Sequence, residues 1–346
     1  MILENIRPMV RYPRLDYLDS FRAFAITMVV AIHTRAYVDL TDQADQIIKP
    51  IVSLIAVPFF FLCDGFLFVN ARIRDQRFAY QTYMINSAKR LLIPWAMFSV
   101  FYLMIRWACE TAGVLKQEFV VGQDPTSVLI DVYGSAIAPQ MYFLLSLFLI
   151  RTMTVFSRFL ATVPIAIVWI AFVVYSFLFQ EVIASSLRNA IAIDLDPIRH
   201  ALWGLQYYLL GAVLSRHHAR IAGSAKALAC AALGACCLTL ALNGFERHLV
   251  ILQYGSMLGA YFFFLTASSR KSWLSRMGQS SMGIYLLHAP VLVKGVSVIV
   301  RTFNAQPILS YIFVVAVTIT AAYSITLLIR KVPNGTVIFG EFSKKL

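Results

Sequence analysis

The sequence predicts an all-α protein, a polytopic bundle of about ten transmembrane helices whose two termini lie in the cytoplasm. Of the 346 residues, 60% are apolar and 14% are charged, and the mean hydropathy is +0.73. A soluble domain is about half apolar and about a quarter charged. The apolar residues also occur in blocks of about twenty, the length of a transmembrane helix, separated by charged clusters. These features exclude soluble enzymes, nucleic-acid-binding modules, fibrous proteins and disordered chains.

Ten apolar spans follow one another along the chain, with boundaries defined to within a few residues. The first span, near 20–38, contains Arg22, His33 and Arg35 and is followed by no small-residue cleavage site, so it is not a cleaved signal peptide. The other spans lie near residues 50–70, 91–109, 139–156, 163–180, 200–215, 227–243, 248–267, 282–300 and 307–329.

The charges between the spans indicate the orientation of the bundle. The net charge is +13 and the pI is near 9.7. The basic segments are the N-terminus, 71–90, 157–162, 215–226, 268–281 and the tail, and the acidic or mixed loops are 39–49, 110–138 and 181–199. This alternation satisfies the positive-inside rule and requires no nucleic-acid partner. We therefore expect one integral-membrane domain over residues 1–346, with cytoplasmic segments at 1–19 and 330–346.

The five cysteines indicate neither a disulfide framework nor a metal site. Their number is odd, and all of them lie inside apolar blocks. A framework of disulfides usually needs an even number, and a zinc site usually needs paired C-x-x-C spacing, which the sequence lacks. We expect these cysteines to be small buried side chains, and we expect no metal cofactor.

The first span holds the most informative charges, Asp19, Arg22 and His33, in the stretch YLDSFRAFAITMVVAIH. Ionisable groups inside a membrane are costly, so each is a functional candidate. Eleven residues separate Arg22 from His33, which places both on one helix face about 16 Å apart along the axis. Asp19 precedes Arg22 by three residues and can pair with it. A snorkelling arginine and a packing histidine would also account for this geometry.

Asp64 is a charge inside the second span, in the stretch FFFLCDGFLF. This span descends from outside, which places Asp64 about 9 Å above the inner boundary, near the depth of Arg22. A buried carboxylate without a partner would take up a proton. We therefore expect Asp64 to face Arg22 or another inner cation. The alternative is a neutral Asp64 that hydrogen-bonds to the backbone near Gly65.

Two other spans carry polar groups of interest. Lys89 and Arg90 precede the third span. They suit a phosphate-bearing ligand, although the positive-inside rule and lipid headgroups explain them equally well. In the ninth span, Tyr285 and His288 are three residues apart and share a helix face. His288 is a second candidate acid, base or orienting group, or else it satisfies a neighbouring carbonyl.

Together these motifs resemble the acyltransferase-3 family of multispan membrane O-acyltransferases, over most of the chain. The strongest part is a D-x-x-R-x10-H pattern on the first helix, which Asp19, Arg22 and His33 match. The stretch AKRLLIPW is similar to a family segment in which a basic pair leads into a proline, and GIYLLHAPV is similar to a stretch near the family's C-terminus. Two positions depart from the pattern, because Asp64 replaces the usual serine and Tyr142 the usual tryptophan. These departures suggest a divergent branch.

The resemblance implies an enzyme of the bacterial inner membrane. It would move an acyl group from cytoplasmic acyl-CoA to a hydroxyl of a cell-surface or exported polysaccharide or glycolipid. Acetyl is expected by family habit, and succinyl or a longer chain is the alternative. His33 would be the general base, with an acyl-histidine intermediate as the main variant, and Arg22 and Asp19 would support it. Arg22, Lys89 and Arg90 would bind the donor phosphates.

The remaining expectations concern partners and supporting residues. Side chains with a substrate-binding or supporting role would be Asp64, Tyr142, Tyr285 and His288. The expected partners are acetyl-CoA or another acyl-CoA as co-substrate, membrane lipid, and a carbohydrate or lipid-linked glycan acceptor. The identity of that acceptor and the oligomeric state stay open.

Two other classes of protein also fit a bundle with buried charges. A secondary transporter or flippase for a lipid-linked sugar would use such charges along its substrate path, but the sequence shows neither an internal repeat nor paired broken helices. A membrane scaffold or sensor would leave the buried charges without a purpose. Release of thiol from an acyl-CoA would favour the enzyme, and movement of unmodified substrate would favour the transporter.

Overall fold

The computed structural model describes residues 15–70, 79–115, 120–134, 137–153, 196–233, 249–267, 272–303 and 305–342, together with the single positions 167, 171, 174, 175 and 178. Within this part of the chain every regular element is a helix and no strand is present. The predicted all-α class is therefore confirmed for the described residues.

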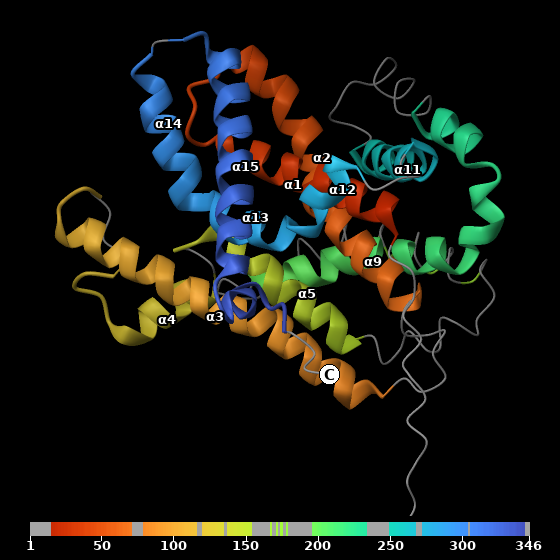
Figure 1. Cartoon of the computed structure of the whole chain (residues 1–346), viewed down its shortest axis with the longest axis horizontal. Helices are drawn as coiled ribbons and strands as arrows, with labels where there is room; N and C mark the ends of the chain where they lie inside the picture. The colour runs from red at the N-terminus through yellow and green to blue at the C-terminus, as the bar shows by residue number, and fades with distance from the viewer. Residues whose placement is uncertain are drawn as a thin grey trace, which may run out of the picture.

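Figure 1 shows how these helices are arranged around α1 and α2. The elements are α1 (Asp16–Thr34), α2 (Asp42–Phe68), α3 (Tyr80–Thr111), α4 (Pro125–Tyr133), η2 (Pro139–Met141), α5 (Tyr142–Met153), α9 (Asp196–Ala222), α11 (Leu249–Ala267), α12 (Trp273–Gln279), α13 (Ser281–Leu287), η5 (His288–Leu292), α14 (Val293–Arg301), α15 (Pro307–Lys331) and η6 (Gly335–Phe339). In Figure 1, α3 lies across the base of the bundle, and α15 stands beside α13 and α14.

Four stretches of the described chain are long and apolar enough to cross a membrane. They are Asp42–Phe68, Tyr80–Thr111, Ser281–Arg301 and Pro307–Lys331. Helix α5 has only 12 residues, and α1 has 19 residues that include Asp19, Arg22 and His33, which lower its hydropathy. The predicted span 163–180 lies almost wholly outside the described residues, as does much of 227–243. The count of ten and the orientation of the termini therefore stay predictions.

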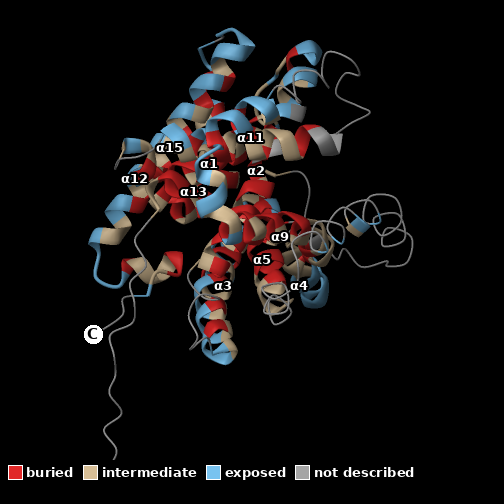
Figure 2. Ribbon diagram, turned by 90° about the vertical axis from the view of Figure 1, so that its right-hand side faces the viewer, coloured by how far each residue is buried: buried red, intermediate tan, exposed pale blue. Residues whose placement is uncertain are grey.

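The buried core lies where α1, α2, α5 and α9 meet (Figure 2). Helix α2 packs extensively against α9, and α1 packs against both α2 and α12. Glycines permit the closest approach: a Cβ on Gly65 would overlap the Tyr208 carbonyl, and one on Gly211 would overlap the Leu62 carbonyl. Small residues at helix interfaces let backbones approach closely, which favours association inside a membrane.

The segments between the predicted spans contain more helix than the sequence indicated. Helix α3 begins at Tyr80, inside the predicted 71–90 loop, and the predicted 110–138 loop contains α4. The predicted 268–281 loop contains α12. Side-chain caps account for the starts of α4 and α12. Asp124 accepts from the Ser127 amide at the start of α4, and Ser272 accepts from the Ser275 amide at the start of α12, both at 3.1 Å. Helix α12 then packs against α1, which brings this segment to the functional site.

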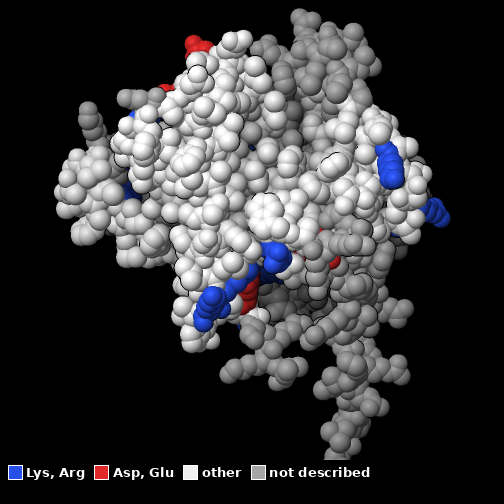
Figure 3. All heavy atoms as spheres, turned by 45° about the horizontal axis from the view of Figure 1, so that its top comes forward, with Lys and Arg blue, Asp and Glu red and all other residues white. Residues whose placement is uncertain are grey.

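One face of the molecule carries few charges on its described residues. The face in Figure 3 is mostly uncharged, and its charged atoms form a few separate groups. Long helices also present large apolar side chains outward; α3, for example, exposes Met97, Val100, Phe101, Met104 and Trp107. Exposed apolar area on this scale is expected of a surface that contacts lipid rather than water.

Candidate functional site

Helix α1 carries candidate residues at both of its ends. Asp19 and Arg22 lie in its first two turns and His33 in its last, as the sequence predicted. The Arg22 guanidinium is 3.8 Å from the Asp19 carboxylate, so the expected pairing is present. The Arg22 Nε is buried, and within the described chain it has no hydrogen-bond partner. Arg22 thus retains capacity to bind an anion.

Arg22 lines a cavity of about 580 Å³ that we call the arginine cavity. Side chains of its wall come from helices α1, α2, α3, α5, α12, α13 and α15 and from the segment after α15. Its charged and amide side chains are Arg22, Arg90, Arg151, Arg330, Asp64, Glu341, Asn86 and Gln279. The remaining wall is largely aromatic and aliphatic, with Phe60, Leu67, Phe68, Phe143, Leu147 and Tyr285 among its members. Four arginines against two carboxylates leave the wall positively charged, which attracts anionic ligands.

Asp64 pairs with Arg151 in this wall, and its partner is not Arg22. Arg151 Nε donates to one Asp64 carboxylate oxygen at 2.9 Å, and a second guanidinium nitrogen donates to the other oxygen. Arg151 also donates to the Ser87 hydroxyl at 3.4 Å. Both carboxylate oxygens of Asp64 therefore accept from a guanidinium, the bidentate geometry typical of an arginine–carboxylate pair, whereas the alternative expected a hydrogen bond to the backbone near Gly65. The sequence indicated an inner cation for Asp64, but the partner comes from α5 and not from α1.

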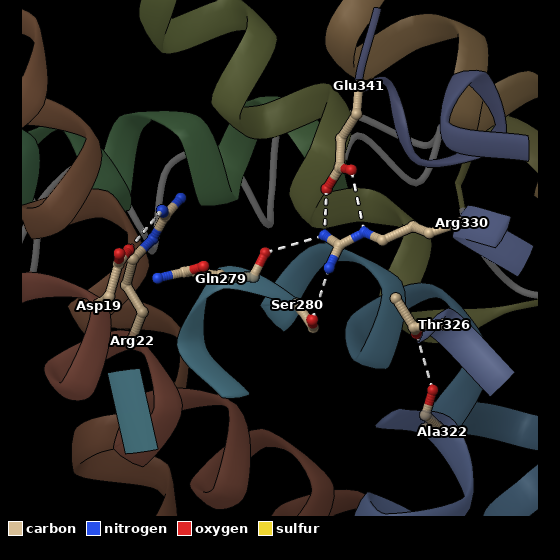
Figure 4. A network of polar contacts seen from close by, with 8 residues as sticks. All are labelled: Asp19, Arg22, Gln279, Ser280, Ala322, Thr326, Arg330 and Glu341. Carbon is tan, nitrogen blue, oxygen red and sulfur yellow. Dashed lines mark hydrogen bonds and ion pairs between the residues drawn. The ribbon is translucent and has the colours of Figure 1, made fainter. Parts of the chain in front are cut away.

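Arg330, at the end of α15, holds the C-terminal segment against the cavity (Figure 4). Its guanidinium donates to the Glu341 carboxylate at 3.0 Å through Nε and again through a second nitrogen. The same guanidinium donates to the Ser280 hydroxyl at 2.7 Å and to the Gln279 carbonyl at 3.0 Å. In Figure 4, Gln279 lies between Arg330 and the pair of Asp19 and Arg22. Arg330 is therefore mostly committed to protein partners.

Arg90 is the lining arginine that has no ion pair within the described chain. Its neighbour Lys89 is exposed and does not line the cavity. Both members of the basic pair that the sequence assigned to a phosphate ligand are exposed, but of the two only Arg90 lines the cavity. Arg22 and Arg90 are the lining cations with the most remaining capacity for an anion.

His33 lies against a second histidine, His288. The ring centres are 5.1 Å apart and the rings are tilted by 58°. His288 is fully buried, whereas His33 is partly exposed. Arg35, just after α1, donates two hydrogen bonds to Asp45 at 2.6 and 2.7 Å, and this pair ties the end of α1 that carries His33 to α2. We call His33 and His288 the histidine pair.

A break in the helix places His288 in this position. Between α13 and α14, Ala289 has extended backbone angles, φ −124° and ψ 154°, and Pro290 has no N–H to offer the helix. The Leu286 carbonyl, four residues before the proline, instead accepts the Tyr102 hydroxyl, and the Ala289 carbonyl accepts the side-chain amide of Gln140. Side chains from α3 and η2 thus satisfy the backbone groups that the break releases.

Tyr285 connects the two regions. Its ring lines the arginine cavity and its centre is 5.9 Å from the centre of the His288 ring. Its hydroxyl donates to the Gln140 carbonyl. The arginine cavity and the histidine pair are therefore neighbouring parts of one site, separated by the Tyr285 ring.

Comparison with known proteins now adds to this geometry. A family model described as "Acyltransferase domain", that of the acyltransferase-3 family, matches residues 15–327, nearly the whole chain. The chain belongs to the acyltransferase-3 family. The matched region contains both parts of the site except for Arg330, Phe339 and Glu341, which follow residue 327. Acyltransferase-3 membership together with the long apolar helices makes this a multi-pass membrane protein of the acyltransferase class.

One other protein is similar to this chain over a shorter segment. An amino-acid racemase of Enterococcus faecalis is 36% identical over 88 residues, which are 23% of this chain and 12% of the racemase. The chain thus spans about an eighth of that protein's length. No solved structure matches the chain.

Two of the predicted site residues, Tyr142 and Lys89, do not line the arginine cavity. The Tyr142 ring packs on His200, with the centres 4.0 Å apart. Lys89 is exposed, as described above. Asp64, Tyr285 and His288 do lie in the site. The roles of all these residues stay predictions.

Sequence reasoning missed several residues of the site. Arg151 has a visible signal, because it is a lone basic residue near the end of the predicted span 139–156. Arg330 and Glu341 looked like ordinary charges of a cytoplasmic tail. Gln140 and Gln279 had no signal at all, because a single amide outside a motif is common in loops. Among the described residues, no group of three His, Cys, Asp or Glu side chains could hold a metal ion.

Proposed function

We propose that this protein is a membrane O-acyltransferase that moves an acyl group, acetyl in the first instance, from cytoplasmic acyl-CoA to a hydroxyl of a carbohydrate acceptor. One observation carries the proposal beyond the family: α1 joins a cationic cavity at Arg22 to a histidine pair at His33. The first part suits the charged end of an acyl-CoA, and the second suits the proton transfer that acylation of a hydroxyl needs.

The arginine cavity is the proposed donor site. Arginine recognises phosphate through charge-assisted hydrogen bonds, and Arg22 and Arg90 have the capacity to make them. We place this end of the bundle in the cytoplasm, because acyl-CoA is made there and because the cationic residues follow the positive-inside rule. Ten spans with both termini on that side remain our proposed topology. The aromatic and aliphatic wall at Phe60, Phe143 and Tyr285 would contact the pantetheine arm.

The proposed chemistry takes place at the histidine pair. Neutral His33 accepts the proton of the acceptor hydroxyl while the acceptor oxygen attacks the thioester carbonyl. An ester C–O bond forms, the C–S bond breaks, and the proton passes from His33 to the leaving coenzyme A thiolate. In the variant mechanism His33 itself attacks and carries the acyl group as an acyl-histidine before the hydroxyl displaces it. Asp19 holds Arg22, and neither takes part in bond making.

The acceptor side is argued from the position of His33. This residue lies at the far end of α1 from the arginine cavity and is partly exposed. An acceptor on the outer side of a bacterial inner membrane, a cell-surface glycan or a lipid-linked precursor, could present its hydroxyl there. Membrane lipid is the expected surrounding, and acetyl is the expected acyl group.

The test supplies acetyl-CoA, labelled on the acetyl group, to the cytoplasmic face of membrane vesicles that contain the protein and native acceptors. We expect label in carbohydrate or lipid-linked material with the wild type and none with His33→Ala at a matched protein level. His217→Ala is the control, because His217 lies on α9 outside both parts of the site. Equal labelling by His33→Ala would refute His33 as the base. Movement of unmodified lipid-linked sugar without thiol release would favour a transporter instead.

A further inference from the structure

The two ring nitrogens of His288 have different surroundings. Nδ1 is 2.7 Å from the Tyr285 carbonyl oxygen and 3.2 Å from the Ile284 carbonyl oxygen. A carbonyl oxygen can only accept, so the proton of neutral His288 must be on Nδ1. Nε2 therefore carries the lone pair and can only accept. The protein fixes the tautomer of this histidine through its own backbone.

The helix break is the reason that the Tyr285 carbonyl is available, whereas the Ile284 carbonyl also accepts the backbone N–H of His288. In a continuous helix, the Tyr285 carbonyl would accept from the amide of residue 289, but Ala289 has left the helical conformation. The Gln140 amide and the Tyr102 hydroxyl then hold the broken segment from two other helices. His288 is consequently fixed in position as well as in tautomer.

The acceptor nitrogen of His288 is buried and unsatisfied. Nε2 has no hydrogen-bond partner among the described residues. Buried polar atoms in native proteins are nearly always paired, so an unpaired one requires an explanation. The aromatic neighbours of the His288 ring include Tyr285, whose hydroxyl already donates to Gln140, and His33. Of these two aromatic neighbours, His33 is the one with an N–H to offer.

The distance allows that bond. The ring centres of His33 and His288 are 5.1 Å apart. Because a ring nitrogen lies about 1 Å from its ring centre, two nitrogens that face each other along the line between the ring centres are about 3 Å apart, the usual length of such a hydrogen bond. His33 is the partly exposed member of the pair.

We propose that His288 is a positioning residue that accepts an N–H from His33 and thereby selects the tautomer of His33 whose other nitrogen is the base. The inference rests on the proposed acyl transfer for its catalytic meaning. Without such a partner, His33 would divide between two tautomers, and only one presents a lone pair to the acceptor hydroxyl. When His33 takes the proton, the same hydrogen bond stabilises the imidazolium. His288 touches neither donor nor acceptor in this scheme.

Two near-isosteric variants separate positioning from a structural role. His288→Gln places an amide oxygen near the position of Nε2 and can still accept from His33. His288→Asn places an amide N–H near the position of Nδ1 and can still donate to the Tyr285 carbonyl, but offers nothing to His33. If His288 only supports the helix break, the asparagine variant should be the more active. If His288 positions His33, the glutamine variant should be the more active of the two.

The activity readout is the steady-state rate in vesicles with acetyl-CoA and native acceptor. We expect His288→Asn to lower kcat by about 100-fold, the lower range for a lost general-base function, with the donor KM changed less than twofold. His288→Gln should keep kcat within about tenfold of wild type, and heating in detergent should leave both variants folded to similar extents. The reverse order of activities, or activities that simply follow stability, would overturn the proposal.

A second measurement does not depend on transfer. Solid-state ¹⁵N NMR of histidine-labelled protein in liposomes reports which nitrogen of each ring is protonated. We expect one tautomer for His33 in the wild type and a mixture of two in His288→Asn, with His288→Gln resembling the wild type. A mixture already present in the wild type would refute the proposal. Wild-type vesicles without any acyl transfer would contradict the proposed function, and the NMR result would still decide the pairing of the two histidines.

Discussion

Replacing Asp64 by asparagine should destabilise the protein, because the change removes the counter-charge of Arg151. The Asp64 and Arg151 side chains are 14% and 12% exposed. Arg151 donates from two nitrogens to the two carboxylate oxygens. An asparagine keeps the size of the side chain and one oxygen, so the substitution chiefly removes the charge. The guanidinium then remains ionised in a largely buried position.

The magnitude follows from the burial of the pair. Removing one partner of a buried ion pair costs about 3–5 kcal/mol. Since Asp64 and Arg151 line a cavity, some solvent reaches them, and we take the lower end, about 3 kcal/mol. Unfolding entropy is about 2.1 cal/mol/K per residue. Over the 346 residues a loss of about 3 kcal/mol therefore lowers the unfolding midpoint by about 4 °C.

The assay is fluorescence-detected size-exclusion chromatography of detergent-solubilised samples after heating. Asp64→Asn and Arg151→Gln should each lower the midpoint by about 4 °C, and the double variant should recover at least half of the combined loss because it leaves no unpaired charge. A midpoint within 1 °C of wild type for Asp64→Asn would refute the reasoning. So would a double variant that loses as much as the two single variants together.

Three further predictions concern other parts of the site. Arg90→Gln should raise the donor KM about tenfold at unchanged kcat, because a lost phosphate contact weakens ground state and transition state alike; initial rates over a donor concentration series check this. Gln140→Leu should destabilise by about 1–3 kcal/mol, since a buried carbonyl of the broken helix loses its donor, and thermal midpoints in detergent would show it. Gly278→Ala should destabilise by at least about 1–3 kcal/mol, because its Cβ would overlap the Asp19 carbonyl, whereas Gly295→Ala, with open space around it, should leave the midpoint unchanged.

The local features of the site could be predicted from the sequence, because they depend on one helix. The three-residue spacing of Asp19 and Arg22 brings their side chains together on any α-helix, and both they and His33 lie on α1 as expected. Tyr285 and His288 are likewise three residues apart and remain neighbours, with ring centres 5.9 Å apart.

The contacts between helices could not be predicted in the same way. Asp64 needed a cation at its depth, but depth alone did not distinguish Arg22 on α1 from Arg151 on α5; the packing of the bundle decides between them. The role of Gln140 depends on a helix break 149 residues later in the chain. Hydropathy reports which segments are apolar and says little about which faces meet. Residues that function through a partner on another helix are therefore the ones that sequence analysis missed.

The separation of the site into two parts follows from opposite physical requirements. In the proposed function the arginines must stay charged to bind phosphate, and four of them in one wall are tolerable because Asp19, Asp64 and Glu341 pair with three and the cavity can admit an anion. The proposed neutral histidine base needs a site without nearby cations. A nearby positive charge would disfavour the imidazolium that forms when the histidine takes up a proton. Helix α1 meets both requirements by placing Arg22 and His33 at opposite ends, with the Tyr285 ring between the arginine cavity and the histidine pair. In the proposed function the donor must reach past that ring, and an acyl-CoA, with its phosphates at one end and its thioester at the other, has a suitable shape and charge.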